Sequence, residues 1–256
     1  MQGASVLRNE VHGHVAVLTM HRPETRNALN RELLGALTAA VAELDADDGI
    51  HAMVLTGADP AFCAGVDLRE LGSGGTDLVL PRSQRGPFPA RSTPLIGAVN
   101  GAAVTGGLEL ALACDWLVAS DRARFADTHA RVGVMPGWGL TVLLPQAVGI
   151  RRAREMSTTG NFVDATTALT WGLVNRVVPH GELLDVALAL ATDVASNDRP
   201  GVARMLQTYE EGVLLTGDEA WALEARVATD WARHQLDPAT VSARREAVIA
   251  RGRTQL

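Results

Sequence analysis

The chain has 256 residues, 47% of them hydrophobic, which is enough to bury one sizeable core without disulfide or metal support. Its formal net charge is −6, from 29 acidic and 23 basic residues, and no run of five or more basic residues occurs, so a nucleic-acid partner is not expected. All 23 basic residues are arginines, which excludes a lysine Schiff-base mechanism.

The cysteines and the apolar segments indicate the cellular compartment in which the protein is expected. Cys63 and Cys114 lie in apolar surroundings without CxxC spacing, so we expect neither a metal site nor a redox pair, and a reducing cytoplasm fits best. The first thirty residues contain no sustained apolar segment, so no secretory signal peptide is expected. The most apolar stretch, residues 108–119, is interrupted by Glu109 and Asp115 and is too short to span a bilayer, which predicts a soluble protein.

In chain order, the first expected element is a strand, because apolar residues alternate over residues 15–19 before a break at Pro23. A helix should follow, with Asn30 as its N-cap and apolar residues at helical spacing until residues 45–49. Residues 51–56 read as a second strand.

Residues 72–91 mix glycine, serine, proline and isolated charges without periodicity, which predicts a loop of the kind that often flanks pockets. A strand over residues 95–99, a turn at Asn100-Gly101, a helix from about Leu108 to Cys114 and a strand over residues 116–119 are expected next. Strands and helices alternate in this half, which favours an α/β fold.

The last expected strand ends at Val178, and the pattern is helical beyond it. Leu183, Ala187, Leu190 and Val194 would share one face of the next helix. A boundary near residues 196–200 then predicts two regions, which are a core domain over residues 1–195 and a C-terminal helical region over residues 196–256.

Two glycine-containing segments, residues 62–68 and 103–109, are candidates for a site, because glycine lets a ligand approach the main chain. If a helix begins at about Gly106, the N–H groups of its first turn have no partner within the helix and can stabilise an oxyanion. Taken alone, each segment also fits an ordinary turn.

The order of several motifs from about Val15 to Val178 closely resembles the crotonase superfamily, the enoyl-CoA hydratases and isomerases. The motifs are Arg22-Pro23 followed by Asn27-Ala28-Leu29, Phe62-Cys-Ala-Gly-Val-Asp67, Pro94 to Gly101, Glu109-Leu-Ala-Leu-Ala-Cys-Asp115 and Gly133-Val-Met-Pro136-Gly137. The resemblance implies a spiral of ββα units and a C-terminal helical region that builds trimers, which commonly pair into hexamers.

Matched position by position, the resemblance implies that the main-chain N–H groups of Val66 and Gly106 hold a thioester carbonyl. It also implies that Glu109 is one of two family glutamates, the acid/base of hydration. Without the surrounding motif, a glutamate in a first helical turn would be explained by the helix dipole alone.

The main departure from the family is His129, which stands at the place of the second glutamate. Histidine can donate or accept a proton near neutral pH, and the alternative is an imidazole that only packs or hydrogen-bonds in the pocket wall. Asp127 and Asp67 could orient water or bind a substrate hydroxyl, or could cap helices. Capping is favoured for Asp67, because Leu68-Arg69-Glu70 has the pattern of a helix start.

Two further departures concern the acyl pocket. Thr105 replaces a third glycine, and Trp138 stands where small residues are usual, so both suggest a narrowed pocket, although Trp138 could instead fill a subunit contact. The coenzyme would lie along the main chain, with Arg22 and Arg26 as candidates near its phosphates, although surface arginines are common. The expected substrate-binding residues are Arg26, Ala28, Ala64, Gly65, Asp67, Leu68, Gly107, Asp127 and Trp138.

The sequence therefore predicts an enoyl-CoA hydratase of fatty-acid β-oxidation that converts a trans-2-enoyl-CoA to a 3-hydroxyacyl-CoA. No metal and no cofactor are expected apart from the coenzyme A of the substrate. The expected assembly is a homo-trimer or homo-hexamer without a membrane partner. The alternatives are an isomerase, decarboxylase or thioester hydrolase that uses the same oxyanion hole, and a protein that binds acyl-CoA without turnover.

Overall fold

A computed structural model describes residues 5–73, 78, 86–213, 215 and 217–234. Most of the predicted loop over residues 72–91 lies outside this range. The chain divides into two compact units, residues 1–203 and 204–256. The proposal that residues 196–256 form a separate helical region stays a prediction.

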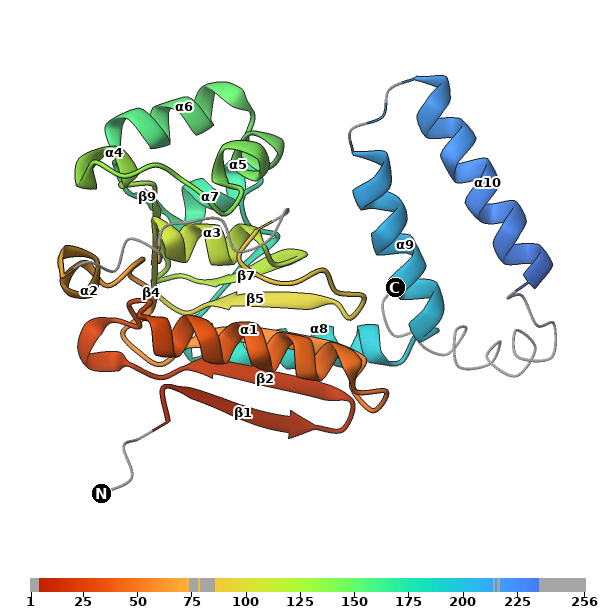
Figure 1. The fold of residues 1–256 in the computed structure, drawn as a ribbon, viewed down its shortest axis with the longest axis horizontal. Coiled ribbons are helices and arrows are strands. Elements are labelled where there is room, and N and C mark those ends of the chain that lie inside the picture. Colours follow the sequence, from red (N-terminus) through yellow and green to blue (C-terminus); the bar gives the residue numbers. More distant parts are fainter. Residues whose placement is uncertain (1–4, 74–77, 79–85, 214, 216, 235–256) are drawn as a thin grey trace. The chain divides into compact units, whose positions relative to one another are not determined.

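The first unit contains a six-stranded sheet in the order β1-β2-β3-β5-β7-β10, in which only β1 is antiparallel to its neighbour (Figure 1). Its strands are β1 (Leu7–His12), β2 (Val15–Met20), β3 (Ala52–Gly57), β5 (Leu95–Val99), β7 (Trp116–Ser120) and β10 (Arg176–Val178). The five strands predicted from the sequence, at residues 15–19, 51–56, 95–99 and 116–119 and before Val178, are therefore confirmed as β2, β3, β5, β7 and β10. Strands buried on both faces read as nearly continuous apolar runs, as β3 and β5 do.

A smaller four-stranded sheet has the order β4-β6-β8-β9, with β9 antiparallel to β8. Its strands are β4 (Ala61–Cys63), β6 (Ala102–Val104), β8 (Arg124–Ala126) and β9 (Val163–Asp164). Each of β3, β5 and β7 enters the large sheet, and the next strand along the chain enters the small one before a helix follows. This succession is a spiral of ββα units, as predicted.

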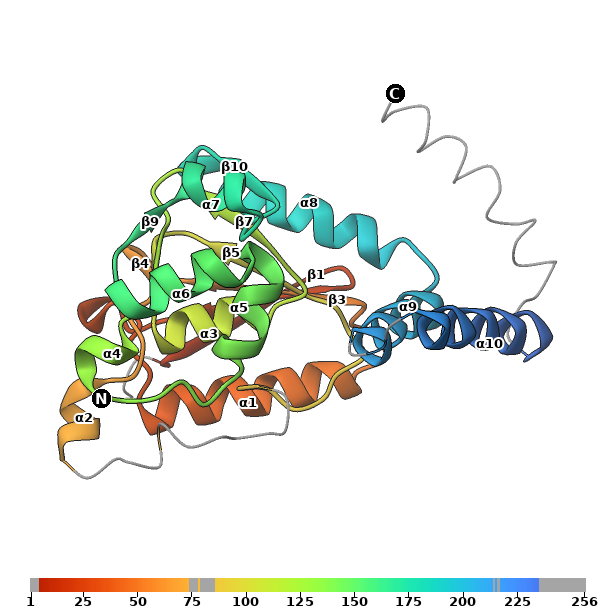
Figure 2. The ribbon, with the colours of Figure 1, turned by 90° about the horizontal axis from the view of Figure 1, so that it is seen from above.

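Helices cover both faces of the large sheet, with α1 (Arg31–Ala46) and α8 (Leu183–Ala195) on opposite sides (Figure 2). Alternate residues of the strands point to opposite faces. On β2, Val15 and Val17 pack in the cluster that contains Leu183 of α8, whereas Leu18 packs with the α1 side chains. The predicted N-cap of α1 is confirmed, because the Asn30 side chain accepts a hydrogen bond from Leu33 N–H.

The described residues form further helices along the chain. They are η1 (Pro23–Thr25), α2 (Leu68–Gly72), α3 (Gly106–Leu112), α4 (His129–Val132), α5 (Leu140–Val148), α6 (Ile150–Thr159), α7 (Ala165–Trp171), η3 (His180–Glu182), α9 (Arg199–Gly212) and α10 (Asp218–His234). Helix α3 begins two residues before its predicted start, at the glycine pair. A β-carbon at Gly107 would lie 2.1 Å from the carbonyl oxygen of Cys63, so only glycine lets α3 lie this close to β4.

Candidate active site

Two main-chain amides meet where α3 begins. Gly106 is the first residue of α3, so its N–H has no acceptor within the helix. Val66 and Leu29 form an isolated parallel β-bridge. Its two hydrogen bonds involve the neighbours of Val66, because Leu29 N–H donates to Gly65 O (2.8 Å) and Asp67 N–H donates to Leu29 O (2.9 Å). The Val66 N–H therefore points to the other side of the chain, as successive residues alternate.

The amides of Val66 and Gly106 are close together. A β-carbon built on Gly106 would lie 3.6 Å from Val66 Cγ2, and one built on Gly65 would lie 3.5 Å from Gly106 N. Neither N–H donates a main-chain hydrogen bond to any residue that the structure describes. Two such donors, held by the backbone, can stabilise negative charge that develops on one oxygen.

Glu109 lies one turn into α3, and its side chain is buried. Its Oε1 accepts hydrogen bonds from the main-chain N–H of Trp138 (2.7 Å) and of Leu140 (3.4 Å). Both donors lie outside α3, so the position of the carboxylate is fixed by a separate segment of the chain. Its other oxygen, Oε2, faces Nε2 of His129 at 3.5 Å.

His129 is the first residue of α4, and it is flanked by two carboxylates. Opposite the Glu109 contact, its Nδ1 lies 2.6 Å from Oδ1 of Asp127. Burial alone would lower the pKa of His129, but the hydrogen bonds and charges of Asp127 and Glu109 outweigh it and raise the pKa to about 9. Its contacts with two carboxylates therefore favour the imidazolium form of His129.

Asp127 follows strand β8 and is only 1% exposed. Burial alone would raise the pKa of its carboxyl group, but hydrogen bonds from His129 and Ser157 outweigh that effect and lower it. Asp127, His129 and Glu109 thus form a buried row of two carboxylates with one imidazolium between them, which we call the Asp-His-Glu row. Sequence reasoning named all three residues but did not predict the contact between Asp127 and the imidazole.

Thr105 connects the amide pair to this row. Its φ of 55° and ψ of −113° lie in a region that favours glycine, so the family glycine at this place has a conformational reason. The Thr105 and Thr128 hydroxyl oxygens are 2.5 Å apart, and Thr128 precedes His129. The pair ties the segment before Gly106 to the start of α4.

Trp138 borders the same region with its ring and its main chain. The ring lies 3.3 Å from the position that a β-carbon on Gly106 would occupy, and the residue is 2% exposed. The ring therefore packs within its own chain beside the amide pair, and the alternative of a subunit contact is not needed to bury it.

Asp67 and Arg22, two residues named in the sequence analysis, have partners within the chain. Asp67 caps α2 by accepting a hydrogen bond from Arg69 N–H (3.1 Å), which confirms the capping interpretation. It also forms an ion pair with Arg22 (3.1 Å), whose guanidinium donates to the carbonyl of Ala28 as well. Arg22 is thereby engaged within the chain.

The other expected substrate contacts differ in exposure, because Gly65 and Gly107 are buried and Ala28 and Ala64 are half-buried. Arg26 and Leu68 are exposed, and the Arg26 carbonyl accepts a hydrogen bond from Ala64 N–H (3.0 Å), so the two segments named for the coenzyme are neighbours. Gly65 follows with a φ of 95°. The roles of all the predicted binding residues toward a substrate stay predictions, namely those of Arg26, Ala28, Ala64, Gly65, Asp67, Leu68, Gly107, Asp127 and Trp138.

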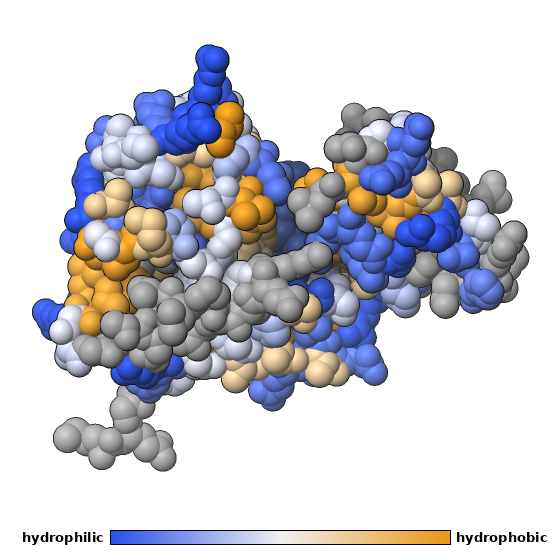
Figure 3. All heavy atoms as spheres, turned by 45° about the horizontal axis from the view of Figure 1, so that its top comes forward, coloured by the Kyte–Doolittle hydropathy of each residue, from blue (hydrophilic) through white to orange (hydrophobic). Residues whose placement is uncertain are grey.

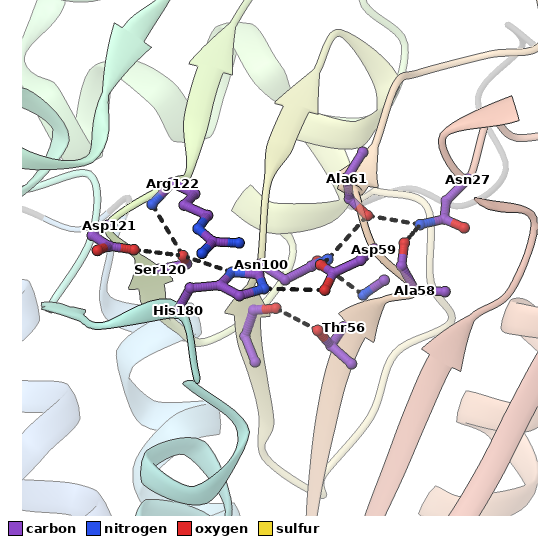
Figure 4. A network of polar contacts seen from close by, with 12 residues as sticks. Asn27, Thr56, Ala58, Asp59, Ala61, Asn100, Ser120, Asp121, Arg122 and His180 are labelled. Atoms are coloured by element: carbon purple, nitrogen blue, oxygen red, sulfur yellow. Dashed lines mark hydrogen bonds and ion pairs between the residues drawn. The ribbon is translucent and has the colours of Figure 1, made fainter. Parts of the chain in front are cut away.

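A second polar cluster joins the carboxyl ends of β3, β5, β7 and β10 (Figure 4). His180 lies between Asp59 Oδ2 (3.0 Å from Nε2) and Ser120 Oγ (3.0 Å from Nδ1). The Asn100 amide donates to Asp59 Oδ1 (2.9 Å), and Arg122 N–H donates to Ser120 Oγ (3.0 Å). Sequence reasoning missed this cluster, because its members come from separate segments and form no local motif.

Other chemistries find less support in the described part of the chain. Burial raises the pKa of both cysteine thiols to about 12, so neither is a thiolate at neutral pH. No group of three or more His, Cys, Asp or Glu side chains suited to a metal ion occurs among the described residues. Within the same residues, no helix has both the length and the apolar character that crossing a bilayer requires.

Comparison with known proteins gives one consistent answer. The family model described as enoyl-CoA hydratase/isomerase matches residues 10–238. A probable peroxisomal enoyl-CoA hydratase of Arabidopsis thaliana is 38% identical over 220 residues, which cover 83% of this chain and 81% of the relative. A putative enoyl-CoA hydratase of Thermus thermophilus is 41% identical over 194 residues, covering 72% of this chain and 76% of the relative.

Solved structures agree with the sequence relatives. An enoyl-CoA hydratase from Mycobacterium tuberculosis H37Rv has a TM-score of 0.77 and 47% identity, covering 88% of this chain and 98% of that one. An enoyl-CoA hydratase from Geobacillus kaustophilus has a TM-score of 0.83 and 30% identity, covering 94% and 95% of the two chains. With the fold and the ordered motifs, these matches show that the chain belongs to the enoyl-CoA hydratase/isomerase family, the crotonase superfamily.

Proposed function

We propose that this protein is an enoyl-CoA hydratase that adds water across the double bond of a trans-2-enoyl-CoA. The observation that carries the proposal is the buried carboxylate of Glu109, which lies in the helix that begins at the amide pair and faces the His129 imidazolium at 3.5 Å. Hydration needs one group that accepts a proton from water and one that donates a proton to carbon. A carboxylate and an imidazole that lie side by side can supply those two roles.

In the proposed reaction, the N–H groups of Val66 and Gly106 donate hydrogen bonds to the thioester carbonyl oxygen. That contact withdraws electron density from the conjugated double bond and stabilises the enolate, and one such donor is worth about 3 kcal/mol. Glu109 takes a proton from water as the water oxygen bonds to the β-carbon. The enolate then takes a proton at its α-carbon from Nε2 of His129.

After addition, Glu109 is protonated and His129 is neutral. Transfer of one proton from Glu109 Oε2 to His129 Nε2, which are 3.5 Å apart, restores both starting states. The sum of the steps is one water molecule added to one double bond. His129 thus takes the part of the second family glutamate, with a cationic acid in place of a neutral one.

The test follows the ultraviolet absorbance of the conjugated thioester with short and long trans-2-enoyl-CoA substrates. Glu109→Gln keeps the size of the side chain and removes the base, so kcat should fall by about a hundred- to ten-thousand-fold. Glu155→Gln, at an exposed site on α6, is the matched control and should behave as wild type.

Wild-type protein that binds these thioesters without consuming them would refute the hydratase proposal. In that case, product analysis with 3-enoyl, malonyl-type and saturated thioesters would distinguish isomerase, decarboxylase and hydrolase activities. Binding without any turnover would leave the acyl-CoA-binding alternative.

For the setting of the reaction, we propose a role in fatty-acid β-oxidation in a reducing cytoplasm, without a cofactor beyond the coenzyme A of the substrate. The two free, buried cysteines support this compartment.

We also propose a homo-trimer or homo-hexamer. Exposed Met205, Tyr209 and Trp221 in the C-terminal helices support it, and hydrophobic surface is visible there in Figure 3. Light scattering of the purified protein tests the assembly.

A further inference from the structure

We propose that Asp127 is a positioning residue, whose carboxylate fixes the His129 ring so that Nε2 carries its proton toward Glu109. The proposal deepens the hydratase proposal and rests on it for the catalytic meaning of His129. Asp127 itself lies on the far side of the imidazole from Glu109, so it acts through His129.

One carboxylate oxygen of Asp127 contacts two nitrogen atoms of His129. Asp127 Oδ1 accepts from the main-chain N–H of His129 at 3.1 Å and contacts its Nδ1 at 2.6 Å. The first contact fixes the carboxylate relative to the start of α4, and the second fixes the rotation of the ring. Because an ionised carboxylate accepts only, Nδ1 must carry a proton in this contact.

Turning the ring over would be costly. A flipped imidazole would present Cδ2 to Asp127 and Cε1 to Glu109, and both carboxylates are buried, at 1% and 2% exposure. A buried carboxylate that loses its hydrogen-bond partner pays the full cost of its desolvation. The same pairing therefore sets the direction of Nε2 and keeps the ring charged.

The charged groups around His129 are few. Glu109 faces it from α3 and Asp127 from the end of β8, while α6 contributes the Ser157 hydroxyl to Asp127. On α4 itself, the Arg131 guanidinium donates to Thr159 O and to Asn161 Oδ1. The charged residues of α6, Arg151, Arg152, Arg154 and Glu155, are exposed. The protonation of His129 is therefore governed by two carboxylates, and one of them is Asp127.

The first test is an NMR titration of ¹⁵N-labelled histidine, with the His129 signals assigned from His129→Gln. In wild type, both ring nitrogens of His129 should be protonated at neutral pH, with a midpoint near pH 9. In Asp127→Asn, which keeps the shape and removes the charge, the midpoint should fall by about one to three pH units. Asp164→Asn is the matched control, because Asp164 caps α7 outside the site and should leave the midpoint unchanged.

The second test is kinetic. Asp127→Asn should lower kcat at neutral pH by about ten-fold or more with little change in KM, because the general acid is lost rather than the binding site. Its alkaline limb should move to lower pH, and lowering the pH should restore part of the activity. A residue that only capped α4 would change stability without moving the pH profile.

The outcomes separate the two proposals. An unchanged His129 midpoint and pH profile in Asp127→Asn would overturn the positioning role, while loss of hydration in Glu109→Gln would still support the hydratase. If wild type does not hydrate enoyl thioesters, the titration still decides whether Asp127 controls His129. If Asp127→Asn fails to fold, an unprotonated Nδ1 in wild type at neutral pH overturns the proposal, and a protonated one supports it.

Discussion

His129 and His180 are both paired with an aspartate, and each has a further polar partner at its other ring nitrogen. His129 lies between Asp127 and Glu109, and His180 lies between Asp59 and Ser120. The side chains of Asp127 and His129 are 2% and 8% exposed, whereas that of Asp59 is 63% exposed. The two clusters therefore share an Asp–His contact and differ in solvation and in the charge of the remaining partner.

The difference teaches what an Asp–His contact can do. Two carboxylates favour the charged form of His129 against the opposing effect of burial, and the charged form is the one that can donate a proton to carbon. Around His180, a neutral hydroxyl and a solvated carboxylate leave a hydrogen-bonded link between the ends of strands that are far apart in sequence (Figure 4). The same pair of residue types thus fits the proposed proton transfer in one place and links strand ends in the other.

The largest expected difference between the two clusters is catalytic. His129→Gln should lower kcat for hydration by about a hundred-fold, because glutamine cannot protonate the α-carbon. His180→Gln should keep kcat within about three-fold of wild type, since its cluster lacks the paired acid and base. Equal losses in the two variants would mean that the contrast between the clusters does not determine activity.

A smaller effect is expected from the hydroxyl of the second cluster. Ser120 is fully buried, and Ser120→Ala would leave Arg122 N–H and one His180 nitrogen without their partner. Urea denaturation should show a loss of about 1–3 kcal/mol in unfolding free energy, with kcat unchanged. Thr192→Ala, which removes an exposed hydroxyl from α8, is the control and should cost less. A fall in kcat with no loss of stability would assign the second cluster to catalysis instead.

The smallest effect concerns stability at alkaline pH. The pKa of His129 is raised from 6.5 to about 9 in the folded protein, so its stabilising contribution is fully present below pH 6.5 and is lost as the pH rises through 9. Unfolding free energy should fall over this window by on the order of 1 kcal/mol, once solvent screening is allowed for. His129→Gln should lack this component, so identical pH dependence in the two proteins would contradict the assigned charge.

Much of the fold could be predicted from the sequence, because the central strands are continuous apolar runs and the helix caps are local. Asn30 and Asp67 were identified as caps from the residues that follow them. Strand β1 was missed, because it is an edge strand with mostly exposed residues and no apolar alternation. The strands of the small sheet have two or three residues each, which is too short for a periodicity to appear.

The candidate site was also predicted only in part from the sequence. Glu109 and His129 were identified through ordered motifs, but their facing geometry needs β8 and α3 to be adjacent in space. The Asp127 contact was not predicted, because residues two apart do not face each other on a helix, and Asp127 lies just before α4 rather than within it. Asp59 and His180 are 121 residues apart in the chain, and no spacing rule connects them.

Trp138 has one more consequence, for the way this protein could be altered. Its main-chain N–H holds the Glu109 carboxylate, while its ring lies beside Gly106. Every residue except proline supplies that N–H. The hydrogen bond to Glu109 therefore depends on the main chain of residue 138, and the shape of the surface beside Gly106 depends on its side chain. A library of variants at position 138 can change that surface while the main-chain hydrogen bond to Glu109 is retained.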